Sequence, residues 1–287
     1  MATGIAILQK EVRFAKRLLA SKGGLIDKMI AIRLLLTQYH TLAGLLEHSN
    51  LQKHLKDDAL LELVAPLTKK EQQALVSALD GEIAMQLVLF KTLDKTIAQD
   101  YFKESFDEKA YAQEWLSNIA YYNKNQTMNE LVKQKQFFMS QAALTLPASQ
   151  VNFQALKDYH IERLCDSQEA GLPCVIKINQ HYGTNLIGGI LLETGKPDYK
   201  DYFFRLYDLS NYLALVNAKL LIKQQQTKAL EIPAFLESLE DNAKNPYTKE
   251  PFIWNSTKLT LSTEGFSFLA EKDSNKGCIQ KDFSRFL

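Results

Sequence analysis

Residues 198–226 read DYKDYFFRLYDLSNYLALVNAKLLIKQQQ, and this stretch decides the fold class. Its large apolar residues recur at intervals of three and four, the spacing that places side chains on one face of an α-helix. The stretch therefore predicts one long helix. We expect its inward-facing side chains to be Phe203, Leu206, Leu209, Leu213, Val216, Leu220 and Leu221.

Helical spacing also fills much of the N-terminal half of the chain. Residues 5–20 combine an apolar face with a basic one, and Gly23-Gly24 ends that helix. Residues 25–47 predict a second helix, which we expect to pair with the first as an αα-hairpin. Its expected inward-facing residues are Ile26, Met29, Ile30, Leu34 and Leu45. Further helices are expected over residues 51–64, 82–102, 107–122, 151–165 and 185–193.

Short motifs predict where some helices begin. Thr68 and Glu71 have the spacing of a capping box, in which the threonine hydroxyl and the glutamate carboxylate bind free amides of the first helical turn. Thr127 and Glu130 repeat that spacing, so we expect another helix to start there. Pro233 predicts a last short helix, because proline suits the first helical turn.

The composition changes after residue 244. Asn245-Pro246-Tyr247-Thr248 predicts a tight turn, because asparagine side chains bond to nearby amides and proline fixes φ. The β-prone pieces 251–254 and 258–262 predict a hairpin, and 265–268 is a candidate third strand. We expect this tail to pack on the helices through a structural motif of Asn245, Pro246, Tyr247, Thr248, Pro251, Phe252 and Trp254.

These patterns together predict a mainly α fold. It would be a multi-helix bundle or an irregular array of αα-hairpins, with a small C-terminal β-hairpin. We expect a helical domain over residues 1–244 with a sub-boundary near 146–173. The hairpin tail would follow over 245–269, and a polar, partly flexible C-terminus over 270–287.

Charge and hydropathy exclude some classes of partner. Lysine and arginine total 34 against 33 acids, so no long-range field favours nucleic acid, and we expect no nucleic-acid partner. No apolar run approaches the roughly 18 to 20 residues that span a bilayer, and the N-terminus lacks the pattern of a signal peptide. Taken on its residues alone, the chain is expected in the cytoplasm.

The three cysteines, Cys165, Cys174 and Cys278, form no CxxC pair. Two interpretations stay open. In one, all three are half-buried free thiols. In the other, Cys165 and Cys174 form a disulfide across a loop-like segment, which requires their Cα atoms to lie within about 7 Å and an oxidising compartment.

No pattern predicts a catalytic or metal site, and we expect no cofactor. His40, His48 and His54 are spaced by eight and six residues, about 80° and 240° around a helix, so they do not converge on a metal. His160 and Cys165 lie about 140° apart on a helix, which argues against a catalytic pair.

Some polar and aromatic residues are candidates for ligand contacts. His181 to Asn185, followed by Gly188-Gly189, has the polar atoms and glycines of a ligand-cradling loop, although close packing of helices explains the glycines better. Aromatic residues are dense from residue 199 to 212. The candidate binding residues are His160, His181, Tyr199 and Tyr202.

The motif at residues 245–254, NPYTKEPFIW, resembles the Asn/Asp-Pro-Tyr/Phe-Thr-Gly-Lys/Glu-Pro-Phe tail of a family of bacterial envelope proteins without an assigned activity. It is also distantly similar to the hairpin tail of type II secretion pseudopilins. Residues 25–31, 125–129 and 185–191 resemble one gammaproteobacterial branch of that family. Lys249 stands where the family usually has glycine, so a left-handed backbone would be less comfortable there. Leu186 stands where proline is common.

The resemblance implies a periplasm-facing domain, tethered to the inner membrane through an N-terminal anchor, and we expect that anchor to be missing from this sequence. It implies no activity. The leading hypothesis is therefore a non-enzymatic interaction or scaffold domain of the bacterial cell envelope with a protein partner. The alternative is a small-ligand-binding protein or an enzyme, with a cleft between helical halves near His160 and His181.

Overall fold

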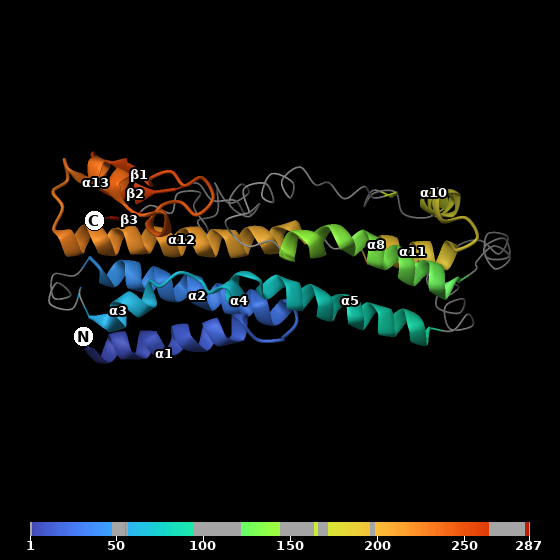
Figure 1. The fold of residues 1–287 in the computed structure, drawn as a ribbon. Helices are drawn as coiled ribbons and strands as arrows, with labels where there is room; N and C mark the ends of the chain where they lie inside the picture. Colours follow the sequence, from blue (N-terminus) through green and yellow to red (C-terminus); the bar gives the residue numbers. More distant parts are fainter. Residues whose placement is uncertain are drawn as a thin grey trace. The chain divides into compact units, whose positions relative to one another are not determined.

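The computed structural model describes residues 2–47, 55, 57–93, 122–143, 164–165, 172–195, 199–263 and 285–286. Helices dominate these ranges, and a small antiparallel sheet lies near the C-terminus (Figure 1), which confirms the predicted fold class. The chain divides into two compact units. Unit 1 comprises Met1–Ala78, Ala142–Lys157 and Lys200–Leu287, and unit 2 comprises Leu79–Gln141 and Asp158–Tyr199. Both units combine segments that are distant in sequence, whereas the sequence analysis expects consecutive domains.

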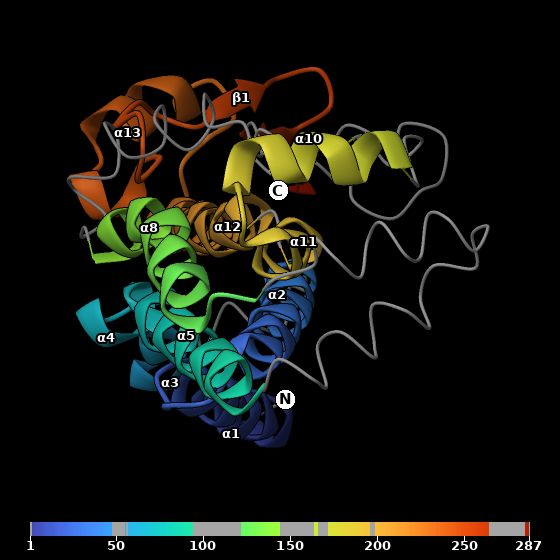
Figure 2. The same cartoon turned by 90° about the vertical axis from the view of Figure 1, so that its right-hand side faces the viewer.

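Three long helices form the body of unit 1. They are α1 (Ala2–Leu19), α2 (Leu25–Leu45) and α12 (Lys200–Gln225). Helix α2 contacts both α1 and α12 and lies between them (Figures 1 and 2). The helices α1 and α2 form the expected αα-hairpin, and the break falls at the predicted glycines, where the Gly24 amide donates to Asp27 Oδ2 at 3.1 Å.

The predicted inward face of α2 is wrong at Ile26 and Ile30, whereas Met29, Leu34 and Leu45 are half-buried. Ile26 is 74% exposed and Ile30 is 49% exposed. The sequence pattern does not identify the buried face because α2 is apolar on nearly all sides and because a lysine belongs to the core. Lys28 is fully buried, and its ammonium donates to the carbonyl oxygens of Leu18 and Ser21 at the end of α1. The buried residues of α2 are Leu25, Lys28, Ala31, Ile32, Leu35, Tyr39, Leu42 and Ala43.

Helix α12 is the central helix of unit 1. All of its predicted inward residues are buried except Leu221, which is half-buried. Polar side chains, including Asp208, Asn211 and Lys219, are buried along it as well, so the helix is covered on nearly every side.

The capping box at Thr68 is confirmed. The Glu71 amide donates to Thr68 Oγ1 at 3.3 Å, and the Thr68 amide donates to Glu71 Oε2 at 2.6 Å. The short helix α4 (Lys69–Gln72) begins there and leads into α5 (Ala74–Thr92), while α3 (Asp58–Leu63) precedes it. Helix α5 starts in unit 1 and continues into unit 2 at Leu79.

Unit 2 contains most of α8 (Lys124–Ala143), together with α10 (Leu172–Tyr182) and α11 (Leu186–Thr194). The predicted start of α8 at Thr127 is wrong. Asn123 precedes the helix and its Oδ1 accepts from the Gln126 amide at 3.1 Å, whereas Thr127 is buried inside the first turns. The apolar core of unit 2 consists of Phe90, Tyr122, Leu131, Val175, Ile178, Tyr182, Leu186, Ile187 and Leu192.

The tail of unit 1 follows α12. It comprises α13 (Ile232–Ser238), the 3-10 helix η3 (Asp241–Ala243), β1 (Ile253–Asn255), β2 (Thr260–Ser262) and β3 (Arg285–Phe286). Strand β2 lies between the other two and pairs with each of them in antiparallel fashion. The candidate strand 265–268 lies outside the described residues. So does the helix expected over 107–122 except for residue 122, and the helix expected over 151–165 except for residues 164–165. The strand β3 lies within the segment that the sequence analysis expects to be polar and partly flexible.

Candidate binding site beside the C-terminal tail

The predicted turn after residue 244 is present. Asn245 Oδ1 accepts from the amides of Tyr247 at 2.9 Å and Thr248 at 3.3 Å, and the Lys249 amide donates to the Asn245 carbonyl at 2.9 Å. Lys249 has φ of 61°, which lies in the left-handed region that disfavours residues with a Cβ. The position at which the resembled family usually has glycine thus has the backbone conformation that glycine favours.

Buried polar contacts hold this turn against α12. The Tyr247 side chain is buried, and its hydroxyl donates to the Tyr207 carbonyl at 2.8 Å. Burial raises the pKa of Tyr247 well above its usual value, so the hydroxyl keeps its proton. Thr263 Oγ1 accepts from Asn245 Nδ2 and Asn211 Nδ2, each at 3.2 Å, and so links the turn, the end of the hairpin and α12. These bonds attach the turn and the end of the hairpin to α12.

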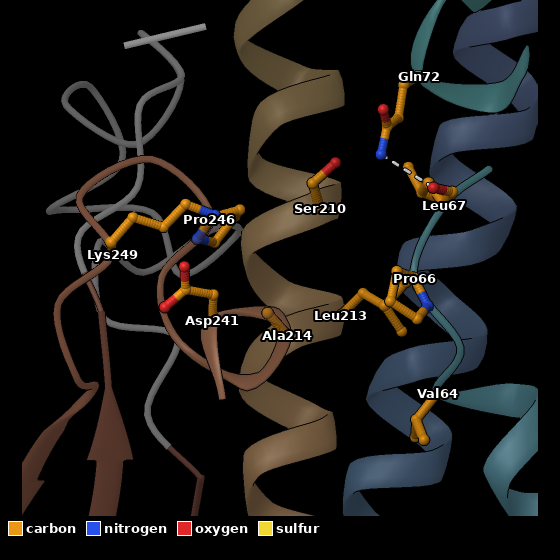
Figure 3. Close-up of a pocket in the computed structure, with 10 residues that line it drawn as sticks. All are labelled: Val64, Pro66, Leu67, Gln72, Ser210, Leu213, Ala214, Asp241, Pro246 and Lys249. Atoms are coloured by element: carbon orange, nitrogen blue, oxygen red, sulfur yellow. Dashed lines mark hydrogen bonds between the residues drawn. The ribbon is translucent and has the colours of Figure 1, made fainter. Parts of the chain in front are cut away.

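A pocket of about 160 Å³ opens beside this turn, entirely within unit 1 (Figure 3). Ser210, Leu213 and Ala214 lie on one face of α12, at the spacing of adjacent helical turns. One wall is the segment that joins α3 to α4, and the other comes from η3 and the turn (Figure 3). The walls consist of Val64, Pro66, Leu67 and Gln72 on one side and Asp241, Pro246 and Lys249 on the other.

Local hydrogen bonds hold the α3–α4 wall in place. Gln72 Nε2 donates to the Leu67 carbonyl at 2.9 Å, and the capping box fixes the chain immediately after Leu67 (Figure 3). Val64 and Leu67 are buried, while Pro66 is exposed. The wall therefore presents apolar side chains from a segment that local hydrogen bonds hold in place.

The pocket has an apolar interior and a rim of opposite charges. Its buried lining residues are mostly apolar, and the Ser210 hydroxyl donates to the Leu206 carbonyl at 3.2 Å. Asp241 and Lys249 are exposed at the edge. This arrangement suits a neutral apolar group more than an ion, because one charge of each sign gives no net field.

The sequence patterns predict a role for only some of the residues that line this pocket. Pro246 belongs to the predicted tail motif, and Leu213 belongs to the predicted buried set of α12. The wall from Val64 to Gln72 was not expected, because its approach to α12 depends on tertiary packing. The capping box at Thr68, which fixes that wall, was the one local signal.

The predicted binding residues have different surroundings in the structure. His181 is exposed at the end of α10, and its ring contacts the ring of Tyr182 with centroids 4.7 Å apart. Tyr199 is buried in unit 2, where Lys135 Nζ donates to its hydroxyl at 3.2 Å. Tyr202, in unit 1, lies near the Arg205 guanidinium. His160 lies outside the described residues.

Three buried lysines are present among the described residues, and each has hydrogen-bond acceptors. Lys28 binds the end of α1, and Lys219 donates to the Ala43 carbonyl and Glu47 Oε1, each at 3.0 Å. Burial lowers the pKa of both groups. Burial also lowers the pKa of Lys135 to about 8, although the carboxylate of Glu82 opposes this shift. These contacts explain the lysines as structural groups.

A buried polar cluster joins α8 to α11 in unit 2. Asn185 Nδ2 donates to Thr127 Oγ1 at 3.0 Å, and the Asn123 amide donates to Asn185 Oδ1 at 2.7 Å. A Cβ at Gly188 would overlap the side chains of Thr127 and Asn185, so this glycine permits close helix packing. The contacts around Asn185 and Gly188 thus serve packing, which agrees with the preferred interpretation of the glycine motif.

Cys165 and Cys174 are joined by a disulfide, with Cα atoms 5.3 Å apart. Both cysteines pack against the apolar core of unit 2. The neighbouring Leu164 amide donates to Glu193 Oε2 at 3.3 Å, and Glu193 Oε1 accepts from the Tyr182 hydroxyl at 2.8 Å. The bridge thus fixes residues 164–165 beside α10 and α11.

Within the described parts of the chain, no three histidine, cysteine, aspartate or glutamate side chains gather in a metal-binding arrangement. None of the helices described above is both long and apolar enough to cross a membrane. Comparisons with protein-family models, with curated proteins and with solved structures find no significant match to this chain.

Proposed function

We propose that this chain is a non-enzymatic interaction domain of the bacterial cell envelope, and that the pocket beside the tail binds one large apolar side chain of a protein partner. The observation that carries the proposal is the composition of the pocket. Its interior is apolar, and Lys249 on its charged rim belongs to the motif at residues 245–254 that resembles the envelope family. Buried apolar anchors of this kind contribute much of the binding energy at protein interfaces.

The size of the pocket limits what it binds. Its volume of about 160 Å³ is close to that of a cavity of roughly 150 Å³ that accepts a benzene molecule. One aromatic ring or one branched aliphatic side chain would fill it. A drug-sized ligand or a cofactor would not, because such molecules occupy sites of about 300 Å³ or more.

The rim supports a polypeptide as the occupant. Asp241 and Lys249 present one acceptor group and one donor group at the edge. A peptide backbone offers both N–H donors and C=O acceptors on either side of an inserted side chain. A partner that inserts an aromatic side chain can therefore satisfy both rim groups with its own backbone.

The disulfide supports the envelope location. Disulfides persist in the periplasm and are rare in the reducing cytosol. If the native protein resides in the periplasm, alkylation of protein from intact cells under denaturing conditions should leave Cys165 and Cys174 unlabelled until a reductant is added. Labelling of both thiols without a reductant would contradict the location.

The pocket is tested with a minimal probe, N-acetyl-phenylalanine amide, followed through methyl NMR signals. We expect the probe to shift the signals of Val64, Leu213 and Ala214 at millimolar concentration, and N-acetyl-glycine amide to leave them unchanged. Ala214→Leu would fill part of the pocket and abolish the response. Ala6→Leu is the matched control, because it adds the same group at an exposed position of α1. An equal response to the glycine probe, or a response retained in folded A214L, would refute the pocket.

A further inference from the structure

Helix α5 carries an apolar stripe that nothing in unit 2 covers within the described chain. Met85 is 61% exposed, Val88 is 62% exposed and Leu89 is 54% exposed. Their spacing of three and four residues places them on one face of the helix. Further exposed residues lie before Met85 and after Leu89 on the same face, which is about three turns long in total. We call this surface the α5 stripe, and it consists of Gly81, Ala84, Met85, Val88, Leu89 and Thr92.

We propose that two copies of this chain associate through the α5 stripe, with the two helices antiparallel about a two-fold axis near residues 86–87. In that register Met85 of one copy lies opposite Val88 of the other. The same register pairs Ala84 with Leu89. A two-fold interface requires a surface that complements itself, and the α5 stripe meets this requirement.

The charges beside the α5 stripe favour this orientation. Asp80 and Lys91 are exposed and eleven residues apart, so they lie roughly 20° apart around the helix and on the same flank. In the antiparallel pair, Asp80 of one copy comes within about two residues, or 3 Å of helical rise, of Lys91 of the other. The two-fold axis creates this attraction twice. In a parallel pair this flank would lie on opposite sides of the interface in the two copies, so Asp80 and Lys91 would not face each other.

The same charges distinguish a second copy from other occupants. A membrane surface that attracts an amphipathic helix usually requires several lysines or arginines on the flanks of the apolar face. The exposed charges beside the α5 stripe are Asp80 and Lys91, and the half-buried Glu82 adds a second acid on the other flank. Because it spans only about three turns, the interface is smaller than the roughly 800 Å² per partner of a standard complex. We therefore expect a weak dimer that forms with increasing concentration.

The proposal does not depend on the tail pocket, because the α5 stripe lies in unit 2. Sedimentation velocity on the full chain over a range of micromolar concentrations tests it. We expect Val88→Lys to raise the dissociation constant at least tenfold. Leu230→Lys is the matched control, since Leu230 is 94% exposed in unit 1, and it should leave the dissociation constant unchanged. Circular dichroism verifies that each variant is folded.

Charge reversal tests the orientation. Asp80→Lys and Lys91→Asp should each raise the dissociation constant several-fold, because each places like charges together. An equimolar mixture of the two variants should associate at least as tightly as the wild type, because every facing pair is then attractive. A chain that stays monomeric at all concentrations, a dimer unaffected by V88K, or a mixture that fails to associate would overturn the proposal. Binding of the wild type to anionic vesicles that V88K abolishes, without dimerisation, would assign the α5 stripe to a membrane instead.

Discussion

Replacing Lys135 with methionine should stabilise the protein, although the substitution removes a hydrogen bond. Lys135 is 4% exposed on α8, and its ammonium lies over the Tyr199 ring, 4.3 Å from the centroid, while donating to the Tyr199 hydroxyl. Within the described part of the chain, the Tyr199 hydroxyl is the one hydrogen-bond acceptor of this ammonium. A buried ammonium with one neutral acceptor is poorly compensated for its lost hydration. Methionine has a similar length and an apolar side chain, so it fills the same space without that cost.

The size of the effect follows from the pKa of the ammonium. Burial lowers that pKa from 10.5 to about 8, against the opposing effect of Glu82. Each pKa unit corresponds to about 1.4 kcal/mol, so the charged form costs roughly 3 kcal/mol in the folded state. We expect Lys135→Met to recover about that free energy of unfolding at pH 7.

The gain should depend on pH in a defined direction. Between pH 8 and pH 10.5 the folded wild type binds fewer protons than the unfolded chain, because its Lys135 has already lost a proton. The stability contribution of Lys135 therefore rises with pH through this window. The advantage of the methionine variant should be largest below pH 8 and should shrink by about 3 kcal/mol by pH 10.5.

Urea unfolding at several pH values measures both effects. Lys133→Met is the matched control, because Lys133 is exposed on the same helix and forms an ion pair with Glu130 at the surface. It should change the free energy of unfolding by less than about 0.5 kcal/mol. A K135M variant that is less stable than the wild type at pH 7 would show that the Tyr199 contact outweighs desolvation. An advantage that does not depend on pH would show that the gain does not come from removing the buried charge.

Three further predictions concern local contacts. Asn245→Ala should reduce the free energy of unfolding, measured in urea, by about 2 to 3 kcal/mol, because it leaves buried amides without a hydrogen bond. Asn255→Ala is the control, because it removes similar side-chain bonds from an exposed turn, and it should cost less than about 1 kcal/mol. Replacing Cys165 and Cys174 together with serine should cost about 3 kcal/mol, because the bridge closes a short loop with a sequence separation of 9, and an unchanged melting temperature would contradict its role. Lys249→Gly should stabilise the fold by roughly 0.5 to 1 kcal/mol, since it relieves a positive φ, and a lower melting temperature would mean that the lysine side chain contributes more than the strain costs.

The elements that the sequence predicts correctly depend on local chemistry. The capping box at Thr68 and the turn at Asn245 both form because a side chain bonds to amides within three residues of itself. Such bonds do not need distant partners. The inward residues of α12 are also predicted correctly, because this helix is buried on most of its surface and almost any choice of inward face would name buried residues.

The failures arise where tertiary contacts override local pattern. Thr127 has the spacing of a capping box, yet it serves as the partner of Asn185, 58 residues away, while Asn123 caps the helix. In α2 the apolar pattern is nearly continuous, and the buried face is set by contacts such as that of Lys28 with the end of α1. The local sequence around Thr127 or Lys28 does not indicate where its distant partner lies in the fold.

The tail motif illustrates how one segment separates folding from binding. Asn245 and Tyr247 point their polar groups into bonds with Thr263 and Tyr207, so their substitution should act on stability. Pro246 and Lys249 line the pocket instead. Neighbouring residues of this turn therefore have different roles, so the pocket-lining side chains can be replaced while the anchoring side chains still hold the turn in place. If the proposed interaction is correct, substitutions at Lys249 should alter probe binding with little loss of stability, whereas those at Asn245 should lose both together, because the wall of the pocket exists only while the turn is formed.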